Sequence, residues 1–296
     1  MMTIHATGQF EAKSWTEQPF DEIDGRPKLS RGVMTNAFSG DITGEGRVEA
    51  LMAYRADGAI SFVSLERVTG QVGDRTGSFV LQHSGVFELN QGTARATWLV
   101  TPGSGAGDLR GLRGQGGYRW DRQRDGQTTP FTLDYEVEPP AADVATARNG
   151  AELSYSETGG LKLTPTRSTF EITGWDQTPL DEPAAGPKLA RATVKKIFRG
   201  DLEGESSAEL LLCQADDGSA GYIGLERVVG RLAGRTGSFV VQHNAVRSDA
   251  AQGGTWFVVP GSATGELRGL RGRAEYRHDE HEAVFTLDYA FEQEGV

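Results

Sequence analysis

Short runs in which apolar and polar residues alternate recur along the whole chain. Phe131–Val137 (FTLDYEV) and Phe285–Phe291 (FTLDYAF) have an apolar side chain at every second position, which is the pattern of a strand with one buried face. No window of eleven or more residues shows the 3.6-residue period of an amphipathic helix. Asp-Gly pairs at 57–58 and 217–218 indicate hairpin turns, because glycine accepts a positive φ. The pattern predicts a chain of short β-strands.

One distinctive stretch occurs twice. Leu65–His83 reads LERVTGQVGDRTGSFVLQH and Leu225–His243 reads LERVVGRLAGRTGSFVVQH, identical at 13 of 19 positions without a gap. Unrelated segments of that length would match at roughly one position, so the domain is duplicated. The offset between the copies is 225 − 65 = 160 residues. We predict a first β-barrel over residues 1–138, a Pro-, Ala- and Gly-rich linker over 139–160 and a second β-barrel over 161–296.

About eight strands per copy, in up-and-down order, predict an all-β fold of two tandem eight-stranded antiparallel barrels. Closing each sheet into a barrel removes exposed strand edges. The 40 glycines of the chain are spread singly between short apolar runs, as expected for the turns and bulges of such a protein. We expect the two barrels to pack as a pseudo-dimer.

Composition limits the kinds of partner and the cellular compartment that we expect. The net charge is −11, from 30 basic and 41 acidic residues, which argues against nucleic acid and against anionic membranes as partners. The sequence shows neither a signal peptide nor an apolar run of the ~20 residues that a bilayer requires. Cys213 is the single cysteine, so an intrachain disulfide is excluded and a reducing compartment is favoured. We therefore expect a cytoplasmic protein, either a monomer or a homodimer.

The order of the motifs carries a resemblance to a known family. LERV, RTGSFVxQH, TW, the glycine-rich PGSxxGxLRGLRG and TLDY follow one another in both halves. This order resembles a bacterial family of unknown function whose members resemble the allene oxide cyclase barrel, and it implies an eight-stranded barrel in each copy. The glycine-rich turn is also similar to that of plant dirigent proteins, which share the barrel. Those relatives guide ring closure or coupling of reactive organic intermediates, but none of their catalytic residues maps onto this sequence.

The repeated stretch predicts an acid–imidazole pair in each half. If the hairpin turn is centred on residues 73–74, residues whose numbers sum to 147 face each other, so that Ser64 faces His83 and Glu66 is the diagonal neighbour of His83. On a lumen face, such a pair could move protons during enolisation or ring closure. The pairing itself would favour ionised glutamate with protonated histidine. We predict the catalytic residues Glu66, His83, Glu226 and His243.

A structural role for the same pair is the alternative. A barrel packed solid would make the pair a satisfied contact, and a shift of register by one residue would move Glu66 to the opposite face. Arg67 and Arg227 alternate with the glutamates, so we expect them to point outward or to bridge to a neighbouring strand. The corresponding positions of the two copies carry different residues, since Tyr54 is matched by Gln214, and the halves are therefore chemically inequivalent. Residues predicted to bind substrate are Tyr54, Phe62, Ser64, Trp98, Gln214, Tyr222 and Trp256.

No motif calls for a cofactor. The cluster HDEH at 278–281 is the one stretch that looks like metal ligands, and its place between the last two strands favours a solvated turn. The glycine-rich motif lacks the Gly-Lys-Ser/Thr of a nucleotide-binding loop. We predict a barrel without metal or cofactor that binds an apolar small molecule and steers its cyclisation or isomerisation. The alternative is a non-catalytic barrel that binds a ligand or serves as an interaction module.

Overall fold

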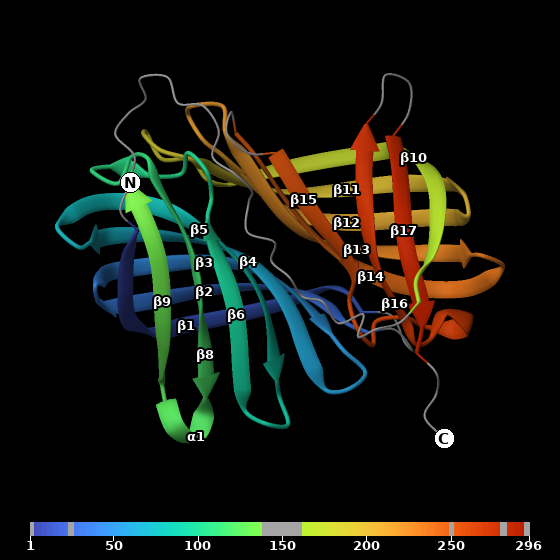
Figure 1. Cartoon of the computed structure of the whole chain (residues 1–296), viewed down its shortest axis with the longest axis horizontal. Helices are drawn as coiled ribbons and strands as arrows, with labels where there is room; N and C mark the ends of the chain where they lie inside the picture. Colours follow the sequence, from blue (N-terminus) through green and yellow to red (C-terminus); the bar gives the residue numbers. More distant parts are fainter. Residues whose placement is uncertain (1–2, 23–26, 138–161, 249–251, 279–282, 293–296) are drawn as a thin grey trace.

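Antiparallel strands form two barrels that lie side by side in the computed structural model, which describes residues 3–22, 27–137, 162–248, 252–278 and 283–292 (Figure 1). The first half contains β1 (Ile4–Asp21), β2 (Leu29–Gly40), β3 (Ile42–Tyr54), β4 (Ala59–Val72), β5 (Arg75–Glu88), β6 (Thr93–Val100), the two-residue β7 (Ala106–Gly107), β8 (Leu112–Asp121), the short helix α1 (Arg122–Asp125) and β9 (Thr128–Val137). The second half contains β10 (Thr164–Asp181), β11 (Lys188–Gly200), β12 (Leu202–Gln214), β13 (Ala220–Leu232), β14 (Arg235–Arg247), β15 (Gln252–Val258), a 3-10 turn (Gly265–Leu267), β16 (Leu270–His278) and β17 (Ala283–Phe291).

Both halves follow the predicted up-and-down order. In the first half, β1 to β6 pair in sequence, β6 continues to β8 and β9, and β9 returns to β1, which makes a ring of eight strands. In the second half, β10 to β17 form a closed barrel. The predicted fold of two eight-stranded antiparallel barrels is therefore confirmed. The predicted linker over 139–160 lies outside the described residues, and within the described part no helix is long and apolar enough to cross a membrane.

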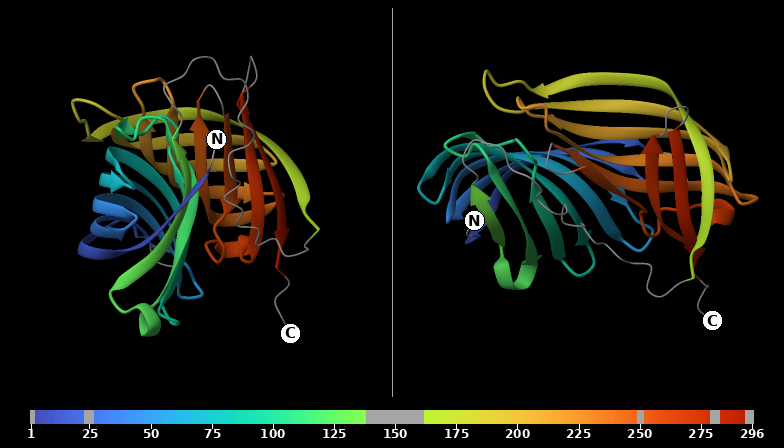
Figure 2. Two further views of the ribbon diagram at one scale, coloured as in Figure 1. Left: turned by 60° about the vertical axis from the view of Figure 1, so that its left-hand side comes forward. Right: turned by 45° about the horizontal axis from the view of Figure 1, so that its top comes forward.

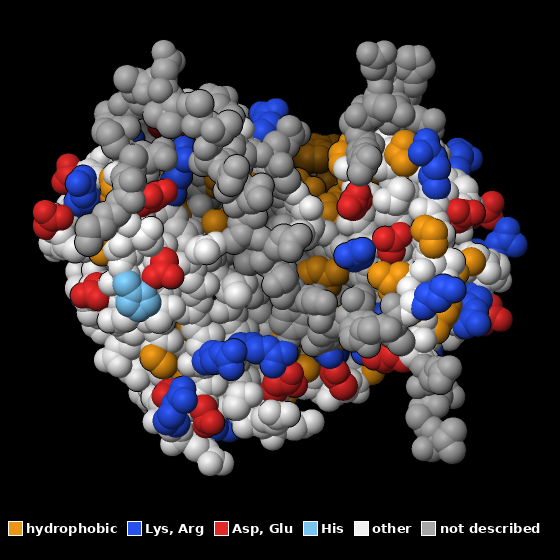
Figure 3. Space-filling model, viewed as in Figure 1, with side chains coloured by type: hydrophobic (Ala, Val, Ile, Leu, Met, Phe, Trp, Pro, Cys, Tyr) orange, Lys and Arg blue, Asp and Glu red, His pale blue; other side chains and the backbone are white. Residues whose placement is uncertain are grey.

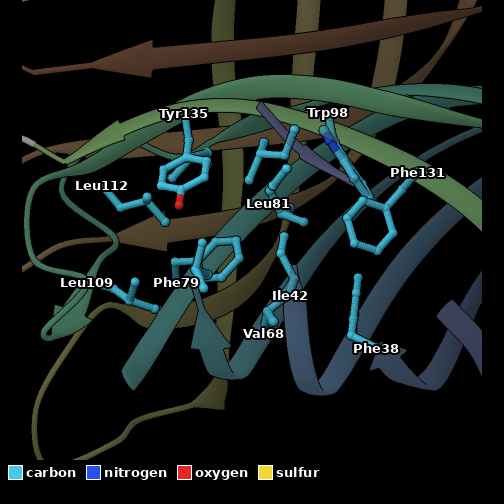
Figure 4. Close-up of a cluster of buried hydrophobic side chains, with 14 of the residues drawn as sticks. Phe38, Ile42, Val68, Phe79, Leu81, Trp98, Leu109, Leu112, Phe131 and Tyr135 are labelled. Atoms are coloured by element: carbon cyan, nitrogen blue, oxygen red, sulfur yellow. The ribbon is translucent and has the colours of Figure 1, made fainter. Parts of the chain in front are cut away.

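Large apolar side chains fill the interior of the first barrel. Figure 4 shows them converging from several strands, with the Phe131 ring centroid 5.5 Å from Trp98 and 5.7 Å from Phe38. The second barrel has a separate interior cluster that includes Phe198, Trp256 and Phe285. Each barrel therefore has a hydrophobic core of its own. Burying one side chain of this size contributes about 1.5–3 kcal/mol to the free energy of unfolding.

The outer faces of β2–β5 and β11–β14 form a third apolar cluster, which joins the two barrels. Figures 1 and 2 show the two barrels side by side. Because side chains alternate along a strand, the residues between the lumen-facing ones supply this contact. Its members are Leu29, Leu51, Ala53, Val63, Leu65, Val80, Leu189, Leu211, Cys213, Ile223, Leu225, Val240 and Val259.

Two arginines make the same contact in opposite directions across this interface. The Arg67 guanidinium donates to the Asp181 carboxylate and to the carbonyl oxygen of Pro187. Arg227 donates in the same way to Asp21 and to the carbonyl oxygen of Pro27. Each residue lies 160 positions from its counterpart, so the contact has the reciprocal form of a two-fold symmetric dimer. The halves pack as the expected pseudo-dimer.

Candidate functional site

The hairpin of the repeated stretch has the predicted register. Ser64 pairs with His83 and Glu66 pairs with Leu81 across β4 and β5, so that the paired residue numbers sum to 147. In the second copy Gly224 pairs with His243 and Glu226 with Val241. Cross-strand partners point to the same face of a sheet, and both glutamates and both histidines are buried within their barrels.

In the first barrel the predicted pair is formed. The Oε2 atom of Glu66 lies 3.1 Å from Nε2 of His83, and its Oε1 accepts a hydrogen bond of 2.7 Å from Nδ2 of Asn36. Gly46 leaves room for this carboxylate, because a Cβ there would lie 2.0 Å from Oε1. The His83 ring meets Trp98 edge-on, with ring centroids 5.3 Å apart, and has Tyr118 at 6.2 Å. Aromatic side chains therefore wall the pair.

In the second barrel a lysine replaces the asparagine. Nζ of Lys196 donates to Oε2 of Glu226 at 2.7 Å, and the Ser206 hydroxyl donates to Oε1 at 2.5 Å. Nε2 of His243 lies 3.6 Å from Oε2 of Glu226, farther than in the first barrel. The lysine ammonium also lies 4.9 Å from the ring centroid of Trp256. The cation that faces the carboxylate is Lys196 rather than the histidine.

The lysine in place of asparagine determines the charge state of the second site. Burial alone would raise the pKa of Glu226, but Lys196, His243 and the Ser206 hydrogen bond outweigh it and hold that pKa below its usual value. Burial lowers the pKa of His243 to about 3; the attraction of Glu226 opposes this shift and the repulsion of Lys196 adds to it. At neutral pH the site therefore holds a lysine–carboxylate ion pair beside a neutral imidazole. Pairing with Glu226 alone would favour a protonated histidine, but burial and Lys196 outweigh it in this half.

A cavity of about 720 Å³ opens at one end of the second barrel. Its walls come from β10 to β16, and Figure 3 shows hydrophobic side chains inside a hollow at the top of this half. Four of the lining residues are aromatic: Trp175, Tyr222, Trp256 and Tyr276. His243 contacts two of them, with ring centroids 4.4 Å from Trp256 and 5.6 Å from Tyr222. The imidazole thus lies directly behind the aromatic wall.

Two side chains in one cross-strand row are smaller than their first-domain counterparts and enlarge this space. We call this the mouth row, and its members are Lys188, Gln214, Ala220 and Arg247. The corresponding row of the first barrel is Lys28, Tyr54, Ile60 and Phe87. Ala220 lacks three of the carbon atoms of Ile60, and Gln214 lacks the ring of Tyr54. The second barrel therefore has free volume where the first has side chains.

A partly open seam widens the same cavity. In the described part of β15 and β16, pairing is confined to Trp256 with Ala274 and Phe257 with Arg273. The equivalent strands of the first barrel, β6 and β8, pair at seven positions. Figure 1 shows β15 slanting away from β16 and β17. As a result Tyr276 is 39% exposed and lines the cavity, whereas its counterpart Tyr118 is paired with Ala96.

Comparison with known proteins places both halves in one family. The sequence profile of the DUF3224 family, described as proteins of unknown function, matches residues 6–135 and 166–291. The chain belongs to the DUF3224 family. A crystal structure of a DUF3224 protein of unknown function from Shewanella oneidensis MR-1 is 36% identical in sequence; the match covers 44% of this chain and 99% of that one, with a TM-score of 0.39. No curated protein matches the chain.

The two DUF3224 domains distribute the predicted binding residues differently. Gln214, Tyr222 and Trp256 line the cavity of the second domain. In the first domain Trp98 and Ser64 are buried and Phe62 is half-buried. Tyr54 donates a hydrogen bond of 2.7 Å to Glu17. The structure brings Glu66 together with His83 and Glu226 together with His243.

Several cavity residues escaped the sequence analysis. Trp175, Lys188, Arg247 and Tyr276 line the cavity, and Lys196 and Asn36 hold the buried carboxylates. Alignment of the copies carried a signal for one of them, because Phe87 of the first domain is matched by Arg247. Of the predicted solvated turn at 278–281, residues 279–281 lie outside the described part. Among the described residues, no group of three or more His, Cys, Asp or Glu could hold a metal ion.

Proposed function

We propose that the second DUF3224 domain binds an apolar small molecule in its cavity. The observation that carries this proposal is the combination of volume and lining, about 720 Å³ walled by four aromatic side chains. Small-molecule sites have volumes of ~300–1,000 Å³ and mostly apolar walls with a few polar groups. The first domain has bulkier side chains in the corresponding row, so the proposal assigns one site to each chain.

Steering of a cyclisation or isomerisation is the finer form of this proposal. Its support is the resemblance of the motif order to the allene oxide cyclase barrel, together with the buried imidazole behind the cavity wall. Neither ring nitrogen of His243 has a hydrogen-bond partner among the described residues. Both oxygens of Glu226 already accept hydrogen bonds. His243, as a neutral imidazole, can donate one hydrogen bond and accept another, so it is the group suited to hydrogen-bond a reacting atom, and Glu226 anchors Lys196.

The proposal gives the first-domain pair, Glu66 and His83, no part in turnover. Glu66 and His83 lie among Trp98, Tyr118 and other interior rings, and their catalytic role remains a prediction. Once a substrate is known, His243→Gln should lower kcat, whereas His83→Gln should leave it unchanged. Equal loss in both variants would assign chemistry to both domains.

Binding can be tested without knowing the natural ligand. N-phenyl-1-naphthylamine, a neutral apolar fluorophore, should bind the full chain saturably. Gln214→Tyr/Ala220→Ile installs the first-domain side chains in the mouth row, and should weaken binding at least about tenfold because it fills the cavity.

The reciprocal variant Tyr54→Gln/Ile60→Ala is the matched control, and its affinity for the fluorophore should not fall. Both variants should keep the circular dichroism spectrum of the wild type. Unaltered affinity in Gln214→Tyr/Ala220→Ile would place the bound fluorophore elsewhere and contradict the proposal.

A further inference from the structure

The mouth row differs from its first-domain counterpart in charge as well as in size. In the first domain Nζ of Lys28 lies 3.1 Å from Oε1 of Glu17, and the Tyr54 hydroxyl donates to the same oxygen. Lys28 also lies over the Tyr54 ring, 3.9 Å from its centroid. The lysine of the first domain therefore has both a carboxylate and a ring as partners.

The second domain keeps the lysine and loses both partners. Glu17 is matched by Gln177, and Tyr54 is matched by Gln214. Within the ranges that the structure describes, Lys188 has no ion pair. Arg247, which takes the place of Phe87, also has none there. Two cations without an ion-pair partner among the described residues thus border one cavity, in a chain with 41 acidic and 30 basic residues.

The neutral side chains at the mouth add hydrogen-bond donors. The side-chain oxygen of Gln177 accepts a hydrogen bond of 3.3 Å from Nε1 of Trp175, which leaves the amide N–H groups of Gln177 for another partner. Gln214 lies between Lys188 and Ala220 in the mouth row and presents the same type of group. Two cations and two side-chain amides therefore lie at this rim.

The acidic groups near the mouth do not cancel this arrangement. Glu275 lines the cavity, and it already has an interaction of its own. Asp216 accepts a hydrogen bond from the backbone N–H of Gly186. Glu182 also lines the cavity; it is exposed, and Glu22 stands at the same position of the first domain, so this acid does not distinguish the two halves.

We infer that the ligand of the second domain is an aromatic anion, a small molecule with a flat apolar body and one carboxylate or sulfonate group. This inference rests on the proposed function and names its ligand class. The body lies against Tyr222, Trp256 and Tyr276, since flat apolar groups stack well on aromatic rings. The anionic group lies at the rim, where Lys188 and Arg247 supply charge-assisted hydrogen bonds.

Two fluorophores that differ by one sulfonate test the inference. They are 8-anilino-1-naphthalenesulfonate and N-phenyl-1-naphthylamine, which is the same molecule without the sulfonate. The readout is the Kd of the neutral probe divided by the Kd of the sulfonate. Lys188→Gln/Arg247→Gln should lower this ratio about tenfold, because each partly exposed charge pair accounts for a few-fold in affinity. Gln177→Glu, which returns the acid of the first domain, should also lower it.

The matched control is Lys195→Gln/Arg199→Gln, which removes two exposed charges of β11 away from the cavity. It corrects for the change in net charge and should keep the wild-type ratio. An unchanged ratio in Lys188→Gln/Arg247→Gln would overturn the anionic ligand and leave the proposed binding intact. If neither probe binds the wild type, the proposed function itself fails.

Discussion

Replacing Lys196 with methionine should lower the free energy of unfolding by about 3–5 kcal/mol, because it leaves a buried carboxylate without its cation. Glu226 is 1% exposed, and Lys196 donates to it at 2.7 Å. Burial without this cation raises the pKa of Glu226, so the variant should also lose more stability as the pH rises through that raised pKa. Urea denaturation, followed by circular dichroism at several pH values, measures both effects.

Two further variants isolate the cause. Lys196→Met/Glu226→Gln removes the orphaned charge and should regain most of the loss. Asn36→Met is the corresponding change in the first domain, where a neutral amide donates to Glu66; it removes a hydrogen bond to a charged group and should cost about 1.5–3 kcal/mol. A cost below 1 kcal/mol for Lys196→Met would show that Lys196 does not stabilise the buried carboxylate.

Acidification should destabilise the wild type by about 2–3 kcal/mol between pH 7 and pH 4.5 through His243 alone. The pKa of His243 in the folded chain is about 3, below its ordinary value of 6.5. In this pH range His243 therefore binds a proton in the unfolded chain but not in the folded chain. Each pH unit below 6.5 favours unfolding by about 1.4 kcal/mol. Glu226 adds to this loss only below its own ordinary pKa of 4.5.

The measurement is the difference in unfolding free energy between pH 7 and pH 4.5. In His243→Gln this difference should be smaller than in the wild type by about 2–3 kcal/mol. Equal pH dependence in the wild type and His243→Gln would contradict the neutral buried imidazole.

Local rules were enough to predict the strands, the hairpin register and the acid–imidazole pair. Alternation with a period of two fixes the face of each residue, and the turn at 73–74 fixes which residues meet. The pairing of Ser64 with His83 follows from these two facts alone. Duplication then carries the same register to Gly224 and His243.

Contacts that span several strands could not be predicted in this way. Lys196 reaches Glu226 across β12, so its role depends on the registers of three strands at once. Alternation placed Arg67 on the outside of its barrel, but it could not show that the outside is a wall shared with a second barrel. Cavity volume depends on side chains from seven strands and on the opening between β15 and β16.

Each chain should hold one small-molecule site, in its second domain. The anomalous scattering of bromine tests it most directly, in crystals of the full chain grown with 6-bromo-2-naphthoate. We expect one bromine peak per chain, inside the cavity bordered by Tyr222, Trp256 and the mouth row. An empty cavity, or peaks of equal height in both barrels, would contradict it.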